Sequence, residues 1–126
     1  MRKLLLVADA SWVQNLVRAA VPSSIEVEEL NDPRQVVDRF REVEPDAVIV
    51  DLQIGSMGGM AVTRAIKSAA FTDLSMDVPI VMLLDRTADA FLARRAGADS
   101  WLVKPVAPAD LRSALGIETT AVEGSS

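Results

Sequence analysis

The 126-residue sequence predicts a doubly wound α/β domain, in which five helices flank a five-stranded parallel sheet of order 2-1-3-4-5. Two observations predict this architecture. Five short apolar runs alternate with five segments whose apolar residues recur at helical spacing. Half of the residues are hydrophobic and a quarter are charged, which is typical of a globular chain. Parallel strands need crossover connections, and right-handed crossovers place helices on both faces of the sheet.

The first half of the chain supplies three strands and two helices. We expect strands over residues 3–8, 25–30 and 46–52. The first and third runs are almost entirely apolar, as in strands covered on both faces, whereas the second begins with the alternation of an edge strand. Asp32 is expected to cap a helix that has Pro33 at its first position. The apolar stripes of the two helices are Val13, Leu16, Val17 and Ala20, and Val36, Phe40 and Val43.

The second half continues the alternation. Strands are expected over residues 79–84 and 100–104, with a loop over residues 71–78. Thr87 is expected to cap the fourth helix, and Gly97 to end it. The last three helices carry Val62, Ala65, Ile66 and Ala69; Phe91, Leu92 and Arg95; and Leu111 and Leu115.

The overall composition limits the class of protein. Residues 1–116 are expected to form one domain, followed by a flexible polar tail over residues 117–126. The net charge is −5 with no basic cluster, so we expect no nucleic-acid binding. The apolar stretch at residues 4–8 is shorter than a signal peptide requires, and no run is long enough for a membrane span. We therefore expect a cytoplasmic protein without a membrane anchor.

The chain contains no Cys and no His. This excludes disulfides, thiol nucleophiles, imidazole bases and thiolate zinc sites. In doubly wound sheets the functional site lies at the carboxyl ends of the strands. Asp9 follows the first strand, Asp51 ends the third and Lys104 ends the fifth. Each also has a structural interpretation: a helix cap, a turn residue and a solvated strand end, respectively.

Together the three residues indicate phosphoryl chemistry. Mg²⁺ prefers one or two carboxylates plus water and phosphate oxygens, and a Lys ammonium neutralises a phosphoryl oxygen. A carboxylate is also a nucleophile that forms an aspartyl phosphate. We therefore expect a Mg²⁺ and phosphoryl pocket at this edge of the sheet.

With these residues in place, the sequence resembles the receiver domain of two-component response regulators. That domain has the flavodoxin-like fold of the bacterial chemotaxis regulator. The resemblance covers residues 2–116. It rests on the segments LLLVADAS, VIVDLQIGSMGG, VPIVML and AGADSWLVKP and on the short final helix. It implies a signalling phosphoprotein rather than an enzyme.

The resemblance assigns roles to individual residues. It implies that Asp51 is the phosphoacceptor and that Lys104, before a cis peptide to Pro105, binds the phosphoryl group. It also implies that Asp9, Asp51 and the backbone carbonyl of Gln53 hold Mg²⁺.

Three departures from the family pattern affect this site. Ala8 stands in place of the first of two metal-binding acids, and Leu84 in place of the Ser or Thr that binds the phosphoryl group. Gly55 and Gly58 replace a Pro and an Asp, so we expect a more mobile loop. We expect weak Mg²⁺ binding, because the site has one acid fewer than the family pattern. We also expect a less sharply biased switch, because the lost hydrogen bond to a charged group is worth about 1.5–3 kcal/mol.

Asp85 directly follows Leu84. The favoured interpretation is a turn residue before the fourth helix. A one-residue change of register would instead point it toward the phosphoryl group, where it would repel that group or act as a metal ligand.

Two tryptophans lie near the expected site. Trp101 occupies the aromatic switch position of the family, but with Leu84 present we interpret it as a half-buried packing or interface residue. Trp12 lies one turn after Asp9, where it either shades the site or is partly buried on its helix. The basic pair at residues 94–95 is interpreted as a solvated face. The resemblance implies that the fourth helix, fifth strand and fifth helix form the surface for an effector protein or a homodimer.

Several functions are compatible with these residues. The resemblance implies that Asp51 accepts a phosphoryl group from a sensor histidine kinase or a phosphotransfer protein. The alternative, motivated by Ala8 and Leu84, is a degenerate receiver that binds proteins independently of phosphorylation. A flavin or nucleotide binder is disfavoured because the loop at residues 8–12 has no Gly. A D-x-D phosphatase is disfavoured because Gln53 stands two positions after Asp51.

Overall fold

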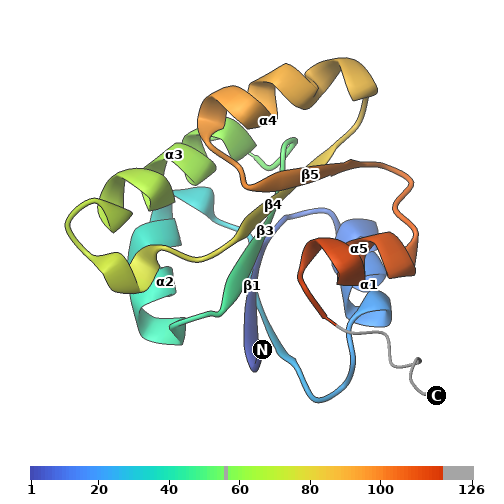
Figure 1. The fold of residues 1–126 in the computed structure, drawn as a ribbon, viewed down its shortest axis with the longest axis horizontal. Coiled ribbons are helices and arrows are strands. Elements are labelled where there is room, and N and C mark those ends of the chain that lie inside the picture. Colours follow the sequence, from blue (N-terminus) through green and yellow to red (C-terminus); the bar gives the residue numbers. More distant parts are fainter. Residues whose placement is uncertain (56, 118–126) are drawn as a thin grey trace.

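The computed structural model describes residues 1–55 and 57–117 and contains one parallel five-stranded sheet (Figure 1). The strand order is β2-β1-β3-β4-β5, which confirms the predicted topology. Strand β2 lies at one edge, as its alternating pattern predicted. The strands are β1 (Lys3–Val7), β2 (Glu26–Leu30), β3 (Ala47–Asp51), β4 (Ile80–Leu84) and β5 (Ser100–Val103).

Five α-helices cover the two faces of the sheet (Figure 1). Helices α1 and α5 pack together on one face, and α2, α3 and α4 cover the other. The helices are α1 (Ser11–Ala20), α2 (Val36–Val43), α3 (Gly59–Ala70), α4 (Ala90–Ala96) and α5 (Pro108–Ala114).

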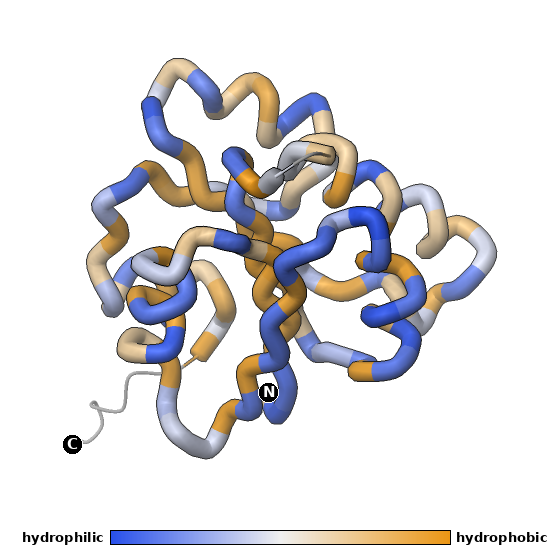
Figure 2. Tube along the Cα trace, turned by 180° about the vertical axis from the view of Figure 1, so that it is seen from behind, coloured by the Kyte–Doolittle hydropathy of each residue, from blue (hydrophilic) through white to orange (hydrophobic). Residues whose placement is uncertain are grey.

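The central strands β1, β3 and β4 are apolar except for Lys3 and Asp51 at their ends, because both of their faces are buried. In β1, Leu4 and Leu6 pack against α1 and α5, whereas Leu5 and Val7 pack against α2 and α3. All four side chains are fully buried. Figure 2 shows the hydrophobic stretches concentrated in the middle of the molecule and the hydrophilic ones toward its outer turns. Burial of this apolar surface is the main stabilising contribution to the fold.

Short 3-10 turns change three of the sequence expectations. Asp32 caps one over Pro33–Gln35, and α2 follows it directly. The expected loop over residues 71–78 contains a second turn, Leu74–Met76, which begins where Asp73 accepts the N–H of Ser75.

The expected cap at Thr87 is wrong. Thr87 begins the third 3-10 turn, Thr87–Asp89, and makes no side-chain cap. Helix α4 then begins at Ala90 and packs against β4 through the small residues Ala93 and Ala96. This phase leaves Phe91 51% exposed.

The chain leaves the domain after α5. Ile117 still packs against the core, and its N–H bonds to the carbonyl of Arg112. The rest of the expected tail, residues 118–126, lies outside the described residues. No helix in the described part is both long and apolar enough to cross a bilayer.

Candidate functional site

The carboxyl edge of the sheet brings Asp51 and Lys104 into direct contact. Lys104 Nζ donates a hydrogen bond to Asp51 Oδ1 at 2.7 Å. Asp9 reaches the same region from β1, because its Oδ2 accepts the N–H of Gly55 at 3.0 Å in the loop that follows Asp51. The three residues named from the sequence therefore lie around one loop.

Strand β3 holds Asp51 in a fixed position as its last residue. Its Oδ1 also accepts the N–H of Gln53 at 3.1 Å, so the turn interpretation is correct but incomplete. The residue is only 2% exposed. Among the described residues, the hydrogen bonds to this carboxylate all end on Oδ1, and Oδ2 receives none.

Gly59 allows the start of α3 to approach this strand end closely. A Cβ at Gly59 would lie 2.7 Å from both the carbonyl oxygen of Asp51 and the Cα of Leu52. Both atoms belong to the backbone and cannot rotate away. A residue without a side chain is therefore needed next to the end of β3 that carries Asp51.

Lys104 is enclosed rather than solvated, since its side chain is only 8% exposed. It follows β5 and precedes a cis bond to Pro105, as the resemblance implied. Burial lowers the pKa of Lys104, but hydrogen bonds to Asp51 and Asp85 outweigh burial and leave that pKa raised. The Trp12 ring centroid lies 5.3 Å from Nζ, within the range of a cation–π contact. Trp12 therefore shades the site, and it is itself 55% exposed.

Asp85 is more than a turn residue, which corrects the favoured sequence interpretation. Its Oδ1 accepts a hydrogen bond from Lys104 Nζ at 3.0 Å. The sheet register explains this contact, because β4 and β5 pair Leu84 with Val103, and the next residue of each strand is Asp85 and Lys104. The strand order thus contained the information that Asp85 and Lys104 follow neighbouring strands and lie close together.

The interpretation of Asp9 as a helix cap is wrong. The N-cap of α1 is Ala10, and it makes no side-chain cap. The exposed carboxylate of Asp9 instead turns to Gly55. Ala8 is fully buried, so the position expected for a further acid presents only a methyl group to the core.

The donor set fits a weakly held Mg²⁺ ion. This cation commonly uses one or two carboxylates and keeps several waters, which suits Asp9, Asp51 and the carbonyl of exposed Gln53. Within residues 1–55 and 57–117, no group of three His, Cys, Asp or Glu side chains forms a metal cluster.

Leu84 and Trp101, to which the resemblance assigned switch positions, make apolar contacts. Leu84 is fully buried with Ala93 and Ala96 of α4, and Trp101 packs against this cluster. Trp101 is half-buried, and the guanidinium of Arg94 lies 5.6 Å from its ring centroid. Leu84 and Trp101 therefore contact α4 through apolar packing, and no side-chain hydroxyl takes part in this contact.

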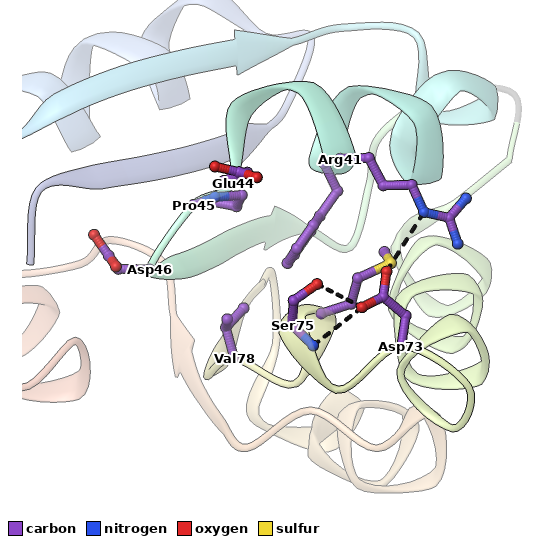
Figure 3. A pocket seen from close by; sticks show the side chains of 9 residues that line it. Arg41, Glu44, Pro45, Asp46, Asp73, Ser75 and Val78 are labelled. Atoms are coloured by element: carbon purple, nitrogen blue, oxygen red, sulfur yellow. Dashed lines mark hydrogen bonds and ion pairs between the residues drawn. The ribbon is translucent and has the colours of Figure 1, made fainter.

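A hollow of about 400 Å³ lies at the opposite edge of the sheet (Figure 3). Its walls come from the end of α2, the loop before β3 and the segment around the 3-10 turn Leu74–Met76. Asp73 spans it, since its carboxylate pairs with Arg41 at 3.7 Å and accepts from Ser75. These polar groups bind one another, and the hollow does not include the Asp51 region.

Comparison with known proteins identifies relatives of this chain. The family model of the response regulator receiver domain matches residues 4–116. The DNA-binding response regulator MtrA of Mycolicibacterium paratuberculosis is 32% identical over 115 residues, which cover 88% of this chain and 48% of MtrA. The chain thus spans about half the length of the curated relatives it matches.

Solved structures show the same fold. The chemotaxis response regulator CheY4 of Vibrio cholerae superposes with a TM-score of 0.78 at 27% identity, covering 92% of this chain and 97% of CheY4. The receiver domain of the sensor histidine kinase PA1611 of Pseudomonas aeruginosa has a TM-score of 0.73 at 24% identity, covering 90% and 93% of the two chains. That domain was solved with a magnesium ion coordinated in its active-site cleft.

Proposed function

Because this chain belongs to the receiver-domain family of two-component response regulators, we propose that Asp51 accepts a phosphoryl group from a sensor histidine kinase or a phosphotransfer protein. The observation that carries the proposal is the 2.7 Å hydrogen bond between Lys104 Nζ and Asp51 Oδ1. It joins a carboxylate nucleophile to the ammonium that neutralises the arriving group.

The hydrogen bonds on Asp51 favour one of its oxygens as the nucleophile. Among the described residues, Oδ1 is held by Lys104 and by the N–H of Gln53 and Oδ2 receives no hydrogen bond, so Oδ2 is the oxygen that attacks phosphorus. The new P–O bond forms on Oδ2 while the P–N bond of the donor phosphohistidine breaks. The electron pair of that bond stays on the imidazole nitrogen. Lys104 stabilises the negative charge on the equatorial oxygens of the transferring group.

Mg²⁺ belongs to this proposal. Asp9, Asp51 and the carbonyl of Gln53 are the groups that would hold it, and the ion would neutralise charge on the phosphoryl oxygens. The hydrogen bond from Gly55 orients the Asp9 carboxylate toward the loop that follows Asp51 and carries Gln53. With Ala8 in place of a further acid, we expect weak binding of the ion.

The partners are expected at two surfaces. The phosphoryl donor docks at the carboxyl edge of the sheet, close to Asp51. An effector protein or a second copy docks on the face formed by α4, β5 and α5, where Phe91 and Trp101 offer apolar surface beside Arg94.

Phosphorylation by a small donor tests the proposal. Purified protein is incubated with acetyl phosphate and increasing Mg²⁺, and the intact mass is recorded. We expect a phosphoryl adduct on the wild-type chain and none on Asp51→Asn. The matched control is Asp38→Asn, which changes an exposed carboxylate on α2 and is expected to keep the adduct. Absence of an adduct at every Mg²⁺ concentration would contradict the proposal and favour a phosphorylation-independent interaction module.

A further inference from the structure

We propose that Asp85 is a built-in counter-ion of Lys104 that competes with the phosphoryl group for its ammonium and so slows phosphorylation of Asp51. This inference rests on the proposed function of Asp51. Its basis is the 3.0 Å hydrogen bond from Lys104 Nζ to Asp85 Oδ1, formed on the same ammonium that contacts Asp51.

Two of the three donors of Lys104 are already in use in the unphosphorylated chain. An ammonium has three N–H groups, and two of them bond to carboxylates at 2.7 and 3.0 Å. The Trp12 ring centroid lies 5.3 Å from Nζ, and the Lys104 side chain is only 8% exposed. An arriving phosphoryl oxygen therefore finds Lys104 enclosed and paired.

Phosphorylation would bring like charges together around Lys104. The phosphoryl group adds anionic oxygens to Asp51, which lies on the same ammonium as the Asp85 carboxylate. Close anions repel, and more strongly where solvent is restricted, as at the buried Asp51 side chain. Asp85 is the group that can leave, because its side chain is 40% exposed and Asp51 is only 3% exposed.

The position of Asp85 makes its carboxylate unfavourable for phosphorylation of Asp51. The buried carboxylate of Asp51 is neutralised by Lys104, and Asp85 adds a second anion to the same cation. Leu84, the preceding residue, offers no hydroxyl that would hold a phosphoryl oxygen in compensation. Asp85 thus stabilises the unphosphorylated arrangement of Lys104 at the expense of the phosphorylated one.

A kinetic experiment separates the charge of Asp85 from its size. Initial rates of adduct formation with acetyl phosphate and Mg²⁺ are measured for the wild type, Asp85→Asn, Asp85→Ala and Asp85→Glu, with Asp38→Asn as the matched control. Loss of a charge-assisted hydrogen bond predicts a rate about tenfold higher for Asp85→Asn and Asp85→Ala. Asp85→Glu and the control are expected to keep the wild-type rate.

The outcomes distinguish this inference from the proposed function. Equal or lower rates for Asp85→Asn overturn the counter-ion inference while leaving Asp51 as the phosphoacceptor. A rise in Asp85→Ala alone assigns the effect to steric cover and also overturns it. If neither the wild type nor any variant forms an adduct, the proposed function is contradicted. The counter-ion inference then fails as well, because it rests on phosphorylation of Asp51.

A spectroscopic measurement checks the ion pair without phosphorylation. In Mg²⁺-free protein labelled with ¹⁵N-lysine, an ammonium held by two carboxylates exchanges slowly enough to give its own NMR signal, assigned through Lys104→Met. We expect this signal to shift or broaden in Asp85→Asn and to persist in Asp85→Glu and Asp38→Asn. An unchanged signal in Asp85→Asn would show that the pair does not form in solution and would overturn the inference.

Discussion

Asp9 accepts a hydrogen bond from the backbone N–H of Gly55 at 3.0 Å and so links the end of β1 to the loop that follows β3. The contact is close, since a Cβ at Gly55 would lie 3.0 Å from Asp9 Oδ2. The carboxylate therefore has a structural role in this loop in addition to the metal-binding role that we propose for it.

Two substitutions of Asp9 separate these roles. Asp9→Asn keeps an oxygen acceptor for Gly55 and loses the charge, whereas Asp9→Ala loses both. We expect both variants to bind Mg²⁺ roughly tenfold more weakly or worse by isothermal titration calorimetry. Only Asp9→Ala is expected to lower the free energy of unfolding, by about 1 kcal/mol. Wild-type Mg²⁺ affinity in Asp9→Asn would exclude Asp9 as a metal ligand.

Gly59→Ala is expected to destabilise the domain by about 1–3 kcal/mol, because a Cβ would lie 2.7 Å from the backbone of Asp51 and Leu52. The direction is informative, since Ala is the better helix former by about 1 kcal/mol. Urea unfolding measures the change. Ser68→Ala, at an exposed position of α3, is the control for helix propensity and is expected to be neutral or stabilising. A stabilised Gly59→Ala variant would show that α3 starts farther from Asp51.

Thr63→Val is expected to raise the free energy of unfolding by about 1 kcal/mol. Thr63 is fully buried on α3, and in the described part of the chain its hydroxyl has no hydrogen-bond partner. Valine has nearly the same shape without the unsatisfied polar atom. Chemical denaturation of Thr63→Val and Thr63→Ser tests this, because serine keeps the hydroxyl, loses a methyl group and is expected to destabilise. A less stable valine variant would mean that the hydroxyl is bonded in solution.

Asp46 is expected to make part of the stability dependent on pH. Hydrogen bonds from the backbone N–H groups of Arg2, at 2.7 Å, and Lys3, at 3.0 Å, lower the pKa of Asp46 below its ordinary value of 3.8. Asp46 therefore contributes fully to the free energy of unfolding at pH values above its ordinary pKa. This contribution is lost as the pH falls through the lower pKa that Asp46 has in the folded state.

Unfolding by denaturant between about pH 5 and pH 2 measures this contribution. We expect Asp46→Asn to lose less stability over that interval than the wild type does. Asp38→Asn, at an exposed position of α2, is the control and is expected to follow the wild-type curve. If the free energy of unfolding falls equally with pH in Asp46→Asn and in the wild type, Asp46 does not contribute to the loss of stability in acid.

The periodicity of the sequence was sufficient to predict the sheet order and the meeting of Asp51 with Lys104. Continuous apolar runs identify strands buried on both faces, and parallel topology sends all of their carboxyl ends to one edge. The motifs around these residues also indicated the correct family and the cis bond after Lys104.

Other features depended on contacts that periodicity does not specify. Two 3-10 turns shifted the starts of α2 and α4, and the phase of α4 buried Ala93 and Ala96 instead of Phe91. The phase of a short helix is set by how closely its small residues pack on the sheet, which involves residues far apart in sequence.

The order of apolar and polar residues by itself determined which segments form strands, the order of these strands in the sheet and which charged residues reach its carboxyl edge. The packed fold decided two further contacts: Asp9 accepts the N–H of Gly55 instead of capping its own helix, and Lys104 bonds to Asp85 in addition to Asp51. The physical reason is that strand formation follows from local patterning and burial, whereas side-chain pairing depends on distances between segments that only the folded chain brings together.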